Sequence, residues 1–400
     1  MTKPELWGPL ASRFAKAEPR KMLALDGGGI RGVLTLSILK AIETQLNQPL
    51  CQYFDYIAGT STGAIIAAGL ARGMSVDELI TFYKDTGTAM FQRTRFLERF
   101  NSLYRNGPLQ QQLKQVFGET TDLKPGQLKT LLLVVTRNVT TDSPWPISSN
   151  PEARYNVPTR TDCNLCIPLW KLVRASTAAP IYFPPEVIQV DPNDDTKTFV
   201  FVDGGVTPYN NPAFVLYRFA TDPAYRLQWP KGEKNLLLVS VGTGAAATEG
   251  SAAGDPEHNM LSTGLGIPSA LMYGSLVDQD INCRAIGRCT YGDVIDRELL
   301  DMVPREGRDE GTPAERMARP RIALGNDLGR SFLYARYNVD LSDEGIARLG
   351  LTGVSSEEAR KMDKADSDHI DLLLQIGAKA AGQVNVAEHF GSFAPLSRMD

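Results

Sequence analysis

The feature that most constrains the fold is a regular alternation of short apolar runs with helical patterns, which begins near residue 22. Five runs have the length and apolar character of buried strands: 21–26, 53–59, 130–136, 198–203 and 235–241. The first two are each followed by a stretch with apolar residues at helical spacing, 32–47 and 62–73. Because strands that alternate with helices build parallel sheets covered on both faces, this pattern predicts a three-layer α/β/α sandwich with a mainly parallel central sheet.

Changes in composition divide the chain into four parts. An N-terminal segment (1–21) precedes the main α/β domain (22–216) and a continuation of that fold (217–300). After residue 300 comes a charged stretch rich in Gly and Pro, and then short helical patterns. We therefore predict a mostly helical C-terminal extension (301–400), whose role the sequence does not define.

Overall composition narrows the range of partners and compartments. The chain is 42% hydrophobic and 22% charged, which is typical of globular proteins, and its net charge of −4 gives no reason to expect a nucleic-acid polymer as partner. The first 21 residues lack the continuous apolar core of a secretory signal, and no run approaches the roughly 18 apolar residues of a membrane span. Five cysteines, an odd number, then favour reduced thiols and a cytoplasmic location.

The cysteines contain one incomplete metal-ligand pattern. Cys163 and Cys166 form a C-x-x-C pair, which is half of a typical structural zinc site. A second close pair is missing from the sequence, because Cys283 and Cys289 are six positions apart. We therefore expect no metal and no cofactor, and interpret the pair as thiols in a loop.

The motif GTSTG at 59–63 lies between a predicted strand and a predicted helix. In this context G-x-S-x-G forms a nucleophile elbow, a sharp turn that presents its serine at the end of the strand. Gly59 and Gly63 leave room for the neighbouring strand and helix, and the helix directs its N-terminal amides and dipole toward Ser61. Ser61 is thus the candidate nucleophile.

The motif DGGGIRG at 26–32 follows the first predicted strand and opens the first predicted helix. One interpretation is an oxyanion hole, in which the amides of consecutive glycines converge on a negative oxygen while Arg31 steadies the loop or the charge. Another is a dinucleotide site, since Gly27, Gly29 and Gly32 fit G-x-G-x-x-G.

The dinucleotide interpretation has a further requirement. It needs an acidic residue about 20 positions beyond the glycines, at the end of the next strand. Glu43 comes too early and lies on the predicted helix, whereas Asp55 lies within the second predicted strand. Neither residue meets the requirement clearly.

A third cluster, FVFVDGG, ends a predicted strand with Asp203, Gly204 and Gly205. An aspartate released from a strand end by two glycines is suited to an active site at the carboxyl edge of a sheet. A carboxylate can accept the serine proton directly, although serine hydrolases usually use histidine as the base. The histidines lie far from these motifs along the chain, and we interpret them as surface or helix-face residues: His258, His369 and His389.

These three motifs resemble those of the patatin-like phospholipase family in their order and spacing: D-G-G-G-x-R-G, then G-x-S-x-G, then D-G-G. The segment RASTAAPIYFPP (174–185) resembles the A-S-x-A-x-P-x-x-F-P block of that family, which runs from a helix into a loop beside the site. The resemblance covers about 22–216 and extends to LLLVSVGTG (236–244).

This resemblance implies a Ser–Asp dyad, with Ser61 as nucleophile and Asp203 as general base. It also implies that Arg31 is the basic residue of the glycine loop, and that the oxyanion is held by the amides of Gly27, Gly28 and Gly29. The implied reaction is hydrolysis of an acyl lipid through an acyl-serine intermediate, without a metal or cofactor. The implied substrates are phospholipids, lysophospholipids or neutral acylglycerols.

Other classes of function stay open at this point. An acyltransferase would share the acyl-serine chemistry, although such enzymes on related folds generally use a histidine. A dinucleotide-dependent oxidoreductase would leave GTSTG and DGG unexplained, and a non-catalytic scaffold would not need every motif residue. The sequence leaves undefined the oligomeric state, the acyl and headgroup specificity, and any activation by a small nucleotide messenger.

Residues 90–105 interleave aromatic and basic side chains in the sequence MFQRTRFLERFNSLYR. A basic amphipathic helix of this kind can lie in a lipid interface, which would give the protein a transient peripheral contact with membranes. The alternative is an ordinary surface helix that packs its aromatic residues on the core.

Overall fold

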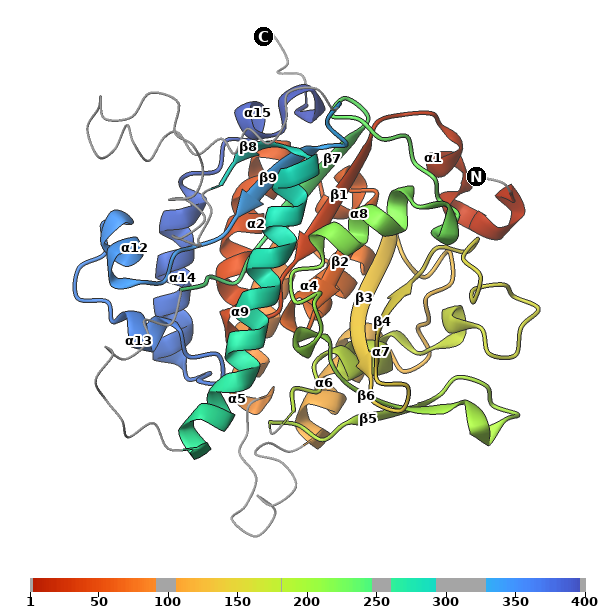
Figure 1. Ribbon diagram of the computed structural model, residues 1–400, viewed down its shortest axis with the longest axis horizontal. Helices are drawn as coiled ribbons and strands as arrows, with labels where there is room; N and C mark the ends of the chain where they lie inside the picture. The colour runs from red at the N-terminus through yellow and green to blue at the C-terminus, as the bar shows by residue number, and fades with distance from the viewer. Residues whose placement is uncertain (1–2, 91–105, 181, 247–259, 293–328, 396–400) are drawn as a thin grey trace.

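The computed structural model describes residues 3–90, 106–180, 182–246, 260–292 and 329–395 (Figure 1). Within these residues one nine-stranded sheet has the order β5-β6-β3-β2-β1-β7-β9-β8, with β4 paired to β3. The strands are β1 (Arg20–Leu25), β2 (Tyr56–Thr60), β3 (Leu131–Asn138), β4 (Ser143–Ser148), β5 (Glu186–Gln189), β6 (Thr198–Asp203), β7 (Leu236–Val241), β8 (Arg288–Tyr291) and β9 (Leu333–Tyr337).

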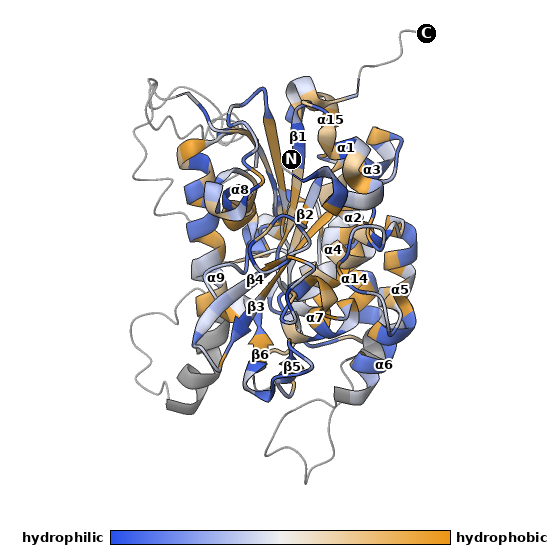
Figure 2. Cartoon of the chain, turned by 90° about the vertical axis from the view of Figure 1, so that its right-hand side faces the viewer, coloured by the Kyte–Doolittle hydropathy of each residue, from blue (hydrophilic) through white to orange (hydrophobic). Residues whose placement is uncertain are grey.

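Most of the sheet is parallel, from β3 through β2, β1, β7 and β9 to β8, whereas β4, β5 and β6 pair in antiparallel fashion. Figure 2 shows the sheet nearly edge-on, with helices on both sides. One face carries α8 (Ala213–Thr221) and α9 (Met260–Ile286). The other carries α2 (Gly32–Leu46), α4 (Thr62–Arg72), α5 (Val76–Met90), α6 (Asn106–Phe117), α7 (Leu169–Ser176) and α14 (Ser367–Ala381). The predicted α/β/α sandwich is confirmed.

The helices that flank the motifs agree closely with the sequence pattern. Helices α2 and α4 begin directly at the glycine loop and at GTSTG, and the Ser75–Glu78 capping box forms at the start of α5 with a 3.2 Å hydrogen bond from the Glu78 amide to Ser75 Oγ. The second strand starts later than predicted, because Leu50–Tyr53 forms a helical turn, α3. Its N-cap position is Pro49, and proline is tolerated there because helix N-termini have unpaired amides anyway.

The C-terminal part is mostly helical, as predicted, but it also completes the sheet. Its short helices are α12 (Asp343–Arg348), α13 (Ser356–Ala359) and α15 (Val386–His389), and its strand β9 lies between β7 and β8. Helix α14 packs so closely on α2 that a Cβ on Gly377 would lie 2.6 Å from Ser37 Oγ. The described residues after 328 are therefore part of the main body, while the domain boundaries themselves stay a prediction.

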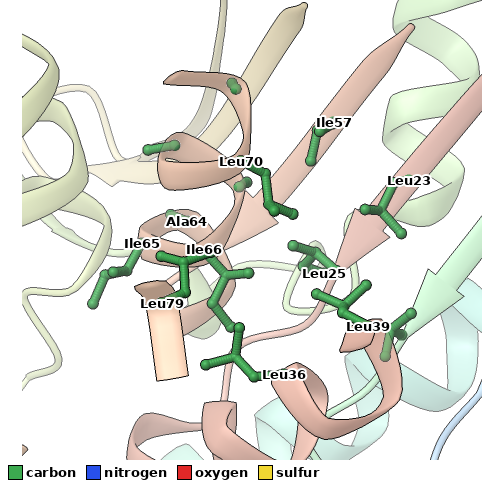
Figure 3. Packing of buried hydrophobic residues seen from close by; sticks show 14 of the residues in the cluster. Leu23, Leu25, Leu36, Leu39, Ile57, Ala64, Ile65, Ile66, Leu70 and Leu79 are labelled. Carbon is green, nitrogen blue, oxygen red and sulfur yellow. The ribbon is translucent and has the colours of Figure 1, made fainter. Parts of the chain in front are cut away.

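The largest core lies between the sheet and the helices around α2 and α4. Figure 3 shows Leu23 and Leu25 of β1 packed close to Leu36 and Leu39 of α2, to Ile57 of β2 and to the apolar face of α4. These side chains are fully buried, and each such leucine or isoleucine contributes about 1.5–3 kcal/mol. A second core, which includes Trp7 and Phe14, lies on the opposite face, next to α8. Two packed faces hold the central strands rigidly, and the candidate site is built at their ends.

Among the described helices, none is both long enough and apolar enough to cross a membrane. Residues 91–105, which contain all the aromatic and basic side chains of the predicted amphipathic helix, lie outside the described residues.

Candidate active site

Ser61 occupies the turn between β2 and α4, the strand–turn–helix context that the sequence predicts. Its backbone angles, φ 54° and ψ −122°, are strained for any residue other than glycine. A Cβ on Gly59 would overlap the carbonyl oxygen of Gly63, and a Cβ on Gly63 would overlap the carbonyl oxygen of Leu25. The strand and the helix thus approach too closely for a side chain at either position, which explains both glycines.

Asp203, at the end of β6, lies directly opposite this turn. Ser61 Oγ donates a 2.7 Å hydrogen bond to Asp203 Oδ2, and the Gly205 amide donates a 2.6 Å bond to Asp203 Oδ1. Both side chains are buried, with exposed fractions of 9% for Ser61 and 4% for Asp203. Gly204 is required here because a Cβ would overlap the carbonyl oxygen of Val135.

The sheet register explains how these two residues meet. Thr60, just before the serine, pairs with Val135 of β3, and the next residue, Thr136, pairs with Asp203. Sequence reasoning treated β6 as one of the strands that end together at the carboxyl edge. Strand β6 is instead antiparallel to β3, so Asp203 approaches the serine from the opposite chain direction. Chain direction could not be read from the sequence, because the apolar pattern of one strand does not say which strand it pairs with or in which direction.

Burial dominates the electrostatics of Asp203. It raises the pKa of this carboxyl to about 6, against the opposing effects of the Gly205 amide, the Ser61 hydroxyl and the positive charge of Arg174. Arg174 on α7 is itself fully buried, and burial lowers its pKa to about 10, so the guanidinium stays charged at neutral pH. Asp203 is therefore mostly ionised at pH 7 but holds a proton more strongly than an exposed aspartate.

The glycine loop after β1 requires one correction to the sequence-based assignment. The Gly27 amide donates a 3.0 Å hydrogen bond to the carbonyl oxygen of Asn210, so it is not available to an oxyanion. The amides of Gly28 and Gly29 have no acceptor among the described residues. Gly29 has φ 61°, which favours glycine, and the loop is further fixed by a 2.9 Å bond from Thr243 Oγ1 to the Gly27 carbonyl.

Arg31 and Gly32 complete this loop. Arg31 Nε makes a long, 3.5 Å contact with the Gly28 carbonyl, while the Arg31 amide donates to the same oxygen at 3.3 Å. Burial and the nearby charge of Arg360 lower the pKa of Arg31 to about 10. Gly32 begins α2 where a Cβ would overlap Thr62 Oγ1. Arg31 thus contacts the backbone of the loop, while its role in the site stays a prediction.

Sequence reasoning missed the strongest support of the glycine loop. Asp26, the first residue of the motif, is fully buried and forms a two-point ion pair with Arg336 of β9, at 2.9 and 2.6 Å. Arg336 also donates a 2.7 Å bond to Ser240 Oγ on β7. Burial raises the pKa of Asp26, and the adjacent guanidinium opposes this effect. Asn210, whose backbone carbonyl binds the Gly27 amide, was missed as well.

The acidic residue that a dinucleotide would require is engaged elsewhere. Asp55 precedes β2, at the opposite end of the strand from Ser61, where its Oδ1 lies 3.0 Å from Arg13 Nε. Its Oδ2 accepts a 2.9 Å bond from the Lys21 amide. Asp55 therefore cannot reach a ligand at the glycine loop, which follows the carboxyl end of β1.

The remaining candidates lie away from the serine. In the described part of the chain no three His, Cys, Asp or Glu side chains are arranged to hold a metal ion. Cys163 is buried and Cys166 exposed, both without a disulfide. His369 and His389 are buried rather than on the surface: His369 Nε2 lies 3.0 Å from the Lys361 carbonyl, and His389 Nδ1 lies 2.8 Å from the Tyr337 hydroxyl. His258 lies outside the described residues.

Fold and site together define an α/β protein in which a serine on a strained strand–helix turn is hydrogen-bonded to a buried carboxylate. The model of the family described as patatin-like phospholipase matches residues 23–217. Patatin group J-1 of Solanum tuberosum is 30% identical over 255 residues, which cover 58% of this chain and 63% of that relative. Patatin-2-Kuras 1 from the same plant is 29% identical over 243 residues. The chain is thus similar to the patatin-like phospholipase family over its first half, and it spans less than two thirds of the length of these relatives.

One solved structure gives a weaker comparison. VipD from Legionella pneumophila has a TM-score of 0.32 and 14% sequence identity to this chain, over 90% of this chain and 67% of that one.

Proposed function

We propose that this protein is a serine lipid acyl hydrolase of the phospholipase A or lysophospholipase type, with Ser61 as nucleophile and Asp203 as general base. The observation that supports this most directly is the 2.7 Å hydrogen bond from Ser61 Oγ to Asp203 Oδ2. A nucleophile and its base must lie within such a distance for the proton to transfer during attack. The similarity to the patatin-like phospholipase family supports acyl lipids as the substrate class.

In the first step Ser61 Oγ attacks the ester carbonyl carbon while its proton passes to Asp203 Oδ2. Negative charge develops on the carbonyl oxygen, and the amides of Gly28 and Gly29 are the donors that can hold it. Asp203 then returns the proton to the departing alcohol or lyso-lipid, and an acyl-serine remains. The raised pKa of Asp203, about 6, suits this exchange because a base works best when its pKa is near the working pH.

In the second step a water molecule takes the place of the departed alcohol. It gives its proton to Asp203 and attacks the acyl-serine carbonyl, and the same two amides hold the oxyanion. Collapse of this intermediate releases the fatty acid and returns the proton to Ser61 Oγ. Each step uses one proton acceptor and one set of donors, so the mechanism needs no histidine.

The test is labelling with a fluorophosphonate, which reacts only with an activated serine. Intact-mass analysis should show a single adduct on the wild-type protein and none on Ser61→Ala. Lipidomics of cells that express either form should then identify the lipid class that the wild type consumes. Labelling that persists in Ser61→Ala would overturn the assignment of the nucleophile.

A further inference from the structure

Ser176 is a buried serine outside the proposed dyad that contacts the backbone of the nucleophile. It is the last residue of α7 and is fully buried. Its Oγ accepts a 2.9 Å hydrogen bond from the Ser61 amide and donates a 2.7 Å bond to the carbonyl oxygen of Val135. One hydroxyl therefore joins α7 and β3 to the turn that carries Ser61.

This contact acts on a strained piece of backbone. The backbone angles of Ser61 are unfavourable for a residue other than glycine, and such a conformation persists only where its surroundings hold it. The Ser61 amide has Ser176 Oγ as its acceptor, so it cannot serve as an oxyanion donor. Loss of the hydroxyl would leave a buried N–H unpaired at the residue whose Oγ must be aimed at the substrate.

The same short segment also holds the other member of the pair. Two residues after Ser176, the carbonyl oxygen of Ala178 accepts a 2.9 Å hydrogen bond from the Asp203 amide. The segment 176–178 is therefore bonded to the backbone of Ser61 on one side and of Asp203 on the other. It can fix the separation of the two residues independently of the bond between their side chains.

We propose that Ser176 is a positioning residue for the proposed reaction, which sets the direction of Ser61 Oγ relative to Asp203 through the Ser61 amide. This inference rests on the proposed function of Ser61. It gives a physical role to the R-A-S-T-A-A-P segment, which the family resemblance places beside the site without assigning a task to its serine.

The experiment compares Ser176→Ala with a matched control, Ser149→Ala. Ser149 is also buried, and its Oγ accepts a 2.8 Å hydrogen bond from a strand amide, that of Leu132. Ser149 makes no hydrogen bond to Ser61 or Asp203 within the part of the chain that the structure describes. A displacement of about 1 Å at a reacting group can cost 10²-fold in rate, so Ser176→Ala should lose about 10–100-fold in kcat with little change in KM. The control should stay within about threefold of wild type.

Each rate is divided by the concentration of folded protein, which is obtained from the near-ultraviolet circular dichroism signal. Ser176→Cys, which keeps the volume and a weak acceptor, should have an intermediate rate and covers the case in which the alanine variant does not fold. The inference would be overturned if Ser176→Ala and Ser149→Ala had equal rates. It would also be overturned if Ser176→Ala did not fold and Ser176→Cys were as active as the wild type. If the wild type fails to react with fluorophosphonate at Ser61, the proposed function fails instead.

Discussion

Replacing Asp203 by asparagine should have opposite effects on catalysis and on stability. The change keeps the shape of the side chain but removes the proton acceptor, and general-base catalysis is typically worth about 10²–10⁴-fold. We expect kcat/KM to fall by at least about 100-fold at pH 8. Fluorophosphonate labelling of Ser61 should slow to a similar degree.

The stability effect follows from the raised pKa of the wild-type carboxyl. Its pKa is about 6 in the folded protein and 3.8 for an ordinary aspartate, so the folded state binds the proton more tightly. As pH rises through this interval, ionising Asp203 costs the folded protein about 1.4 kcal/mol per unit, or roughly 3 kcal/mol above pH 6. Asparagine never ionises, so Asp203→Asn should be more stable than wild type at pH 8 by up to about 3 kcal/mol.

The assay is urea unfolding of both proteins at pH 8 and at pH 4, read from the midpoint shift. Asp203→Asn should have the larger free energy of unfolding at pH 8. The difference should largely disappear at pH 4, where wild-type Asp203 is already protonated. A variant that is less stable than wild type at pH 8, or a difference that does not change with pH, would refute the argument from burial. Activity above one-tenth of wild type would separately refute the role of Asp203 as base.

Two further predictions concern charges near the site and along the chain. Arg174→Gln should raise the pKa of Asp203, because it removes the nearby positive charge. The acidic limb of the pH profile of kcat/KM should then move to higher pH. Arg174→Lys keeps the charge and should leave the acidic limb where it is in the wild type. An unmoved limb in the glutamine variant would contradict the electrostatic role. Replacing Arg93, Arg95 and Arg99 together by Glu should weaken binding to anionic vesicles by about 1 kcal/mol per residue. Hydrolysis of a soluble p-nitrophenyl ester should not change. Unchanged vesicle binding would favour the alternative, a surface helix packed on the core.

Local signals in the sequence predicted most of the sandwich and the position of Ser61. The strand before GTSTG, the helix after it and the two glycines act within a few residues of one another, so periodicity and turn chemistry suffice. The parts that could not be predicted depend on contacts between distant segments. The bond of the Gly27 amide to Asn210 depends on how a loop after β6 folds back, and no pattern around Gly27 encodes it.

The predicted C-terminal extension after residue 300 likewise depends on contacts between distant segments, which the sequence does not show. Its apolar run at 333–337 is short and contains Arg336, which reads as an exposed position in a sequence. Only the fold reveals that this arginine is buried against Asp26. Charged residues are rarely fully buried unless they are paired, and a partner 310 positions away leaves no local trace.

The pairing of Asp26 with Arg336 has a consequence for the order of events during synthesis. The carboxylate that begins the glycine loop leaves the ribosome first, and its guanidinium partner follows 310 residues later. Until then, burial of Asp26 would leave an unpaired charge in the interior, which is strongly unfavourable. The loop can therefore reach its final form only after β9, which carries Arg336, has been synthesised. A chain that ends before β9 would carry Ser61 without this support for the glycine loop beside it.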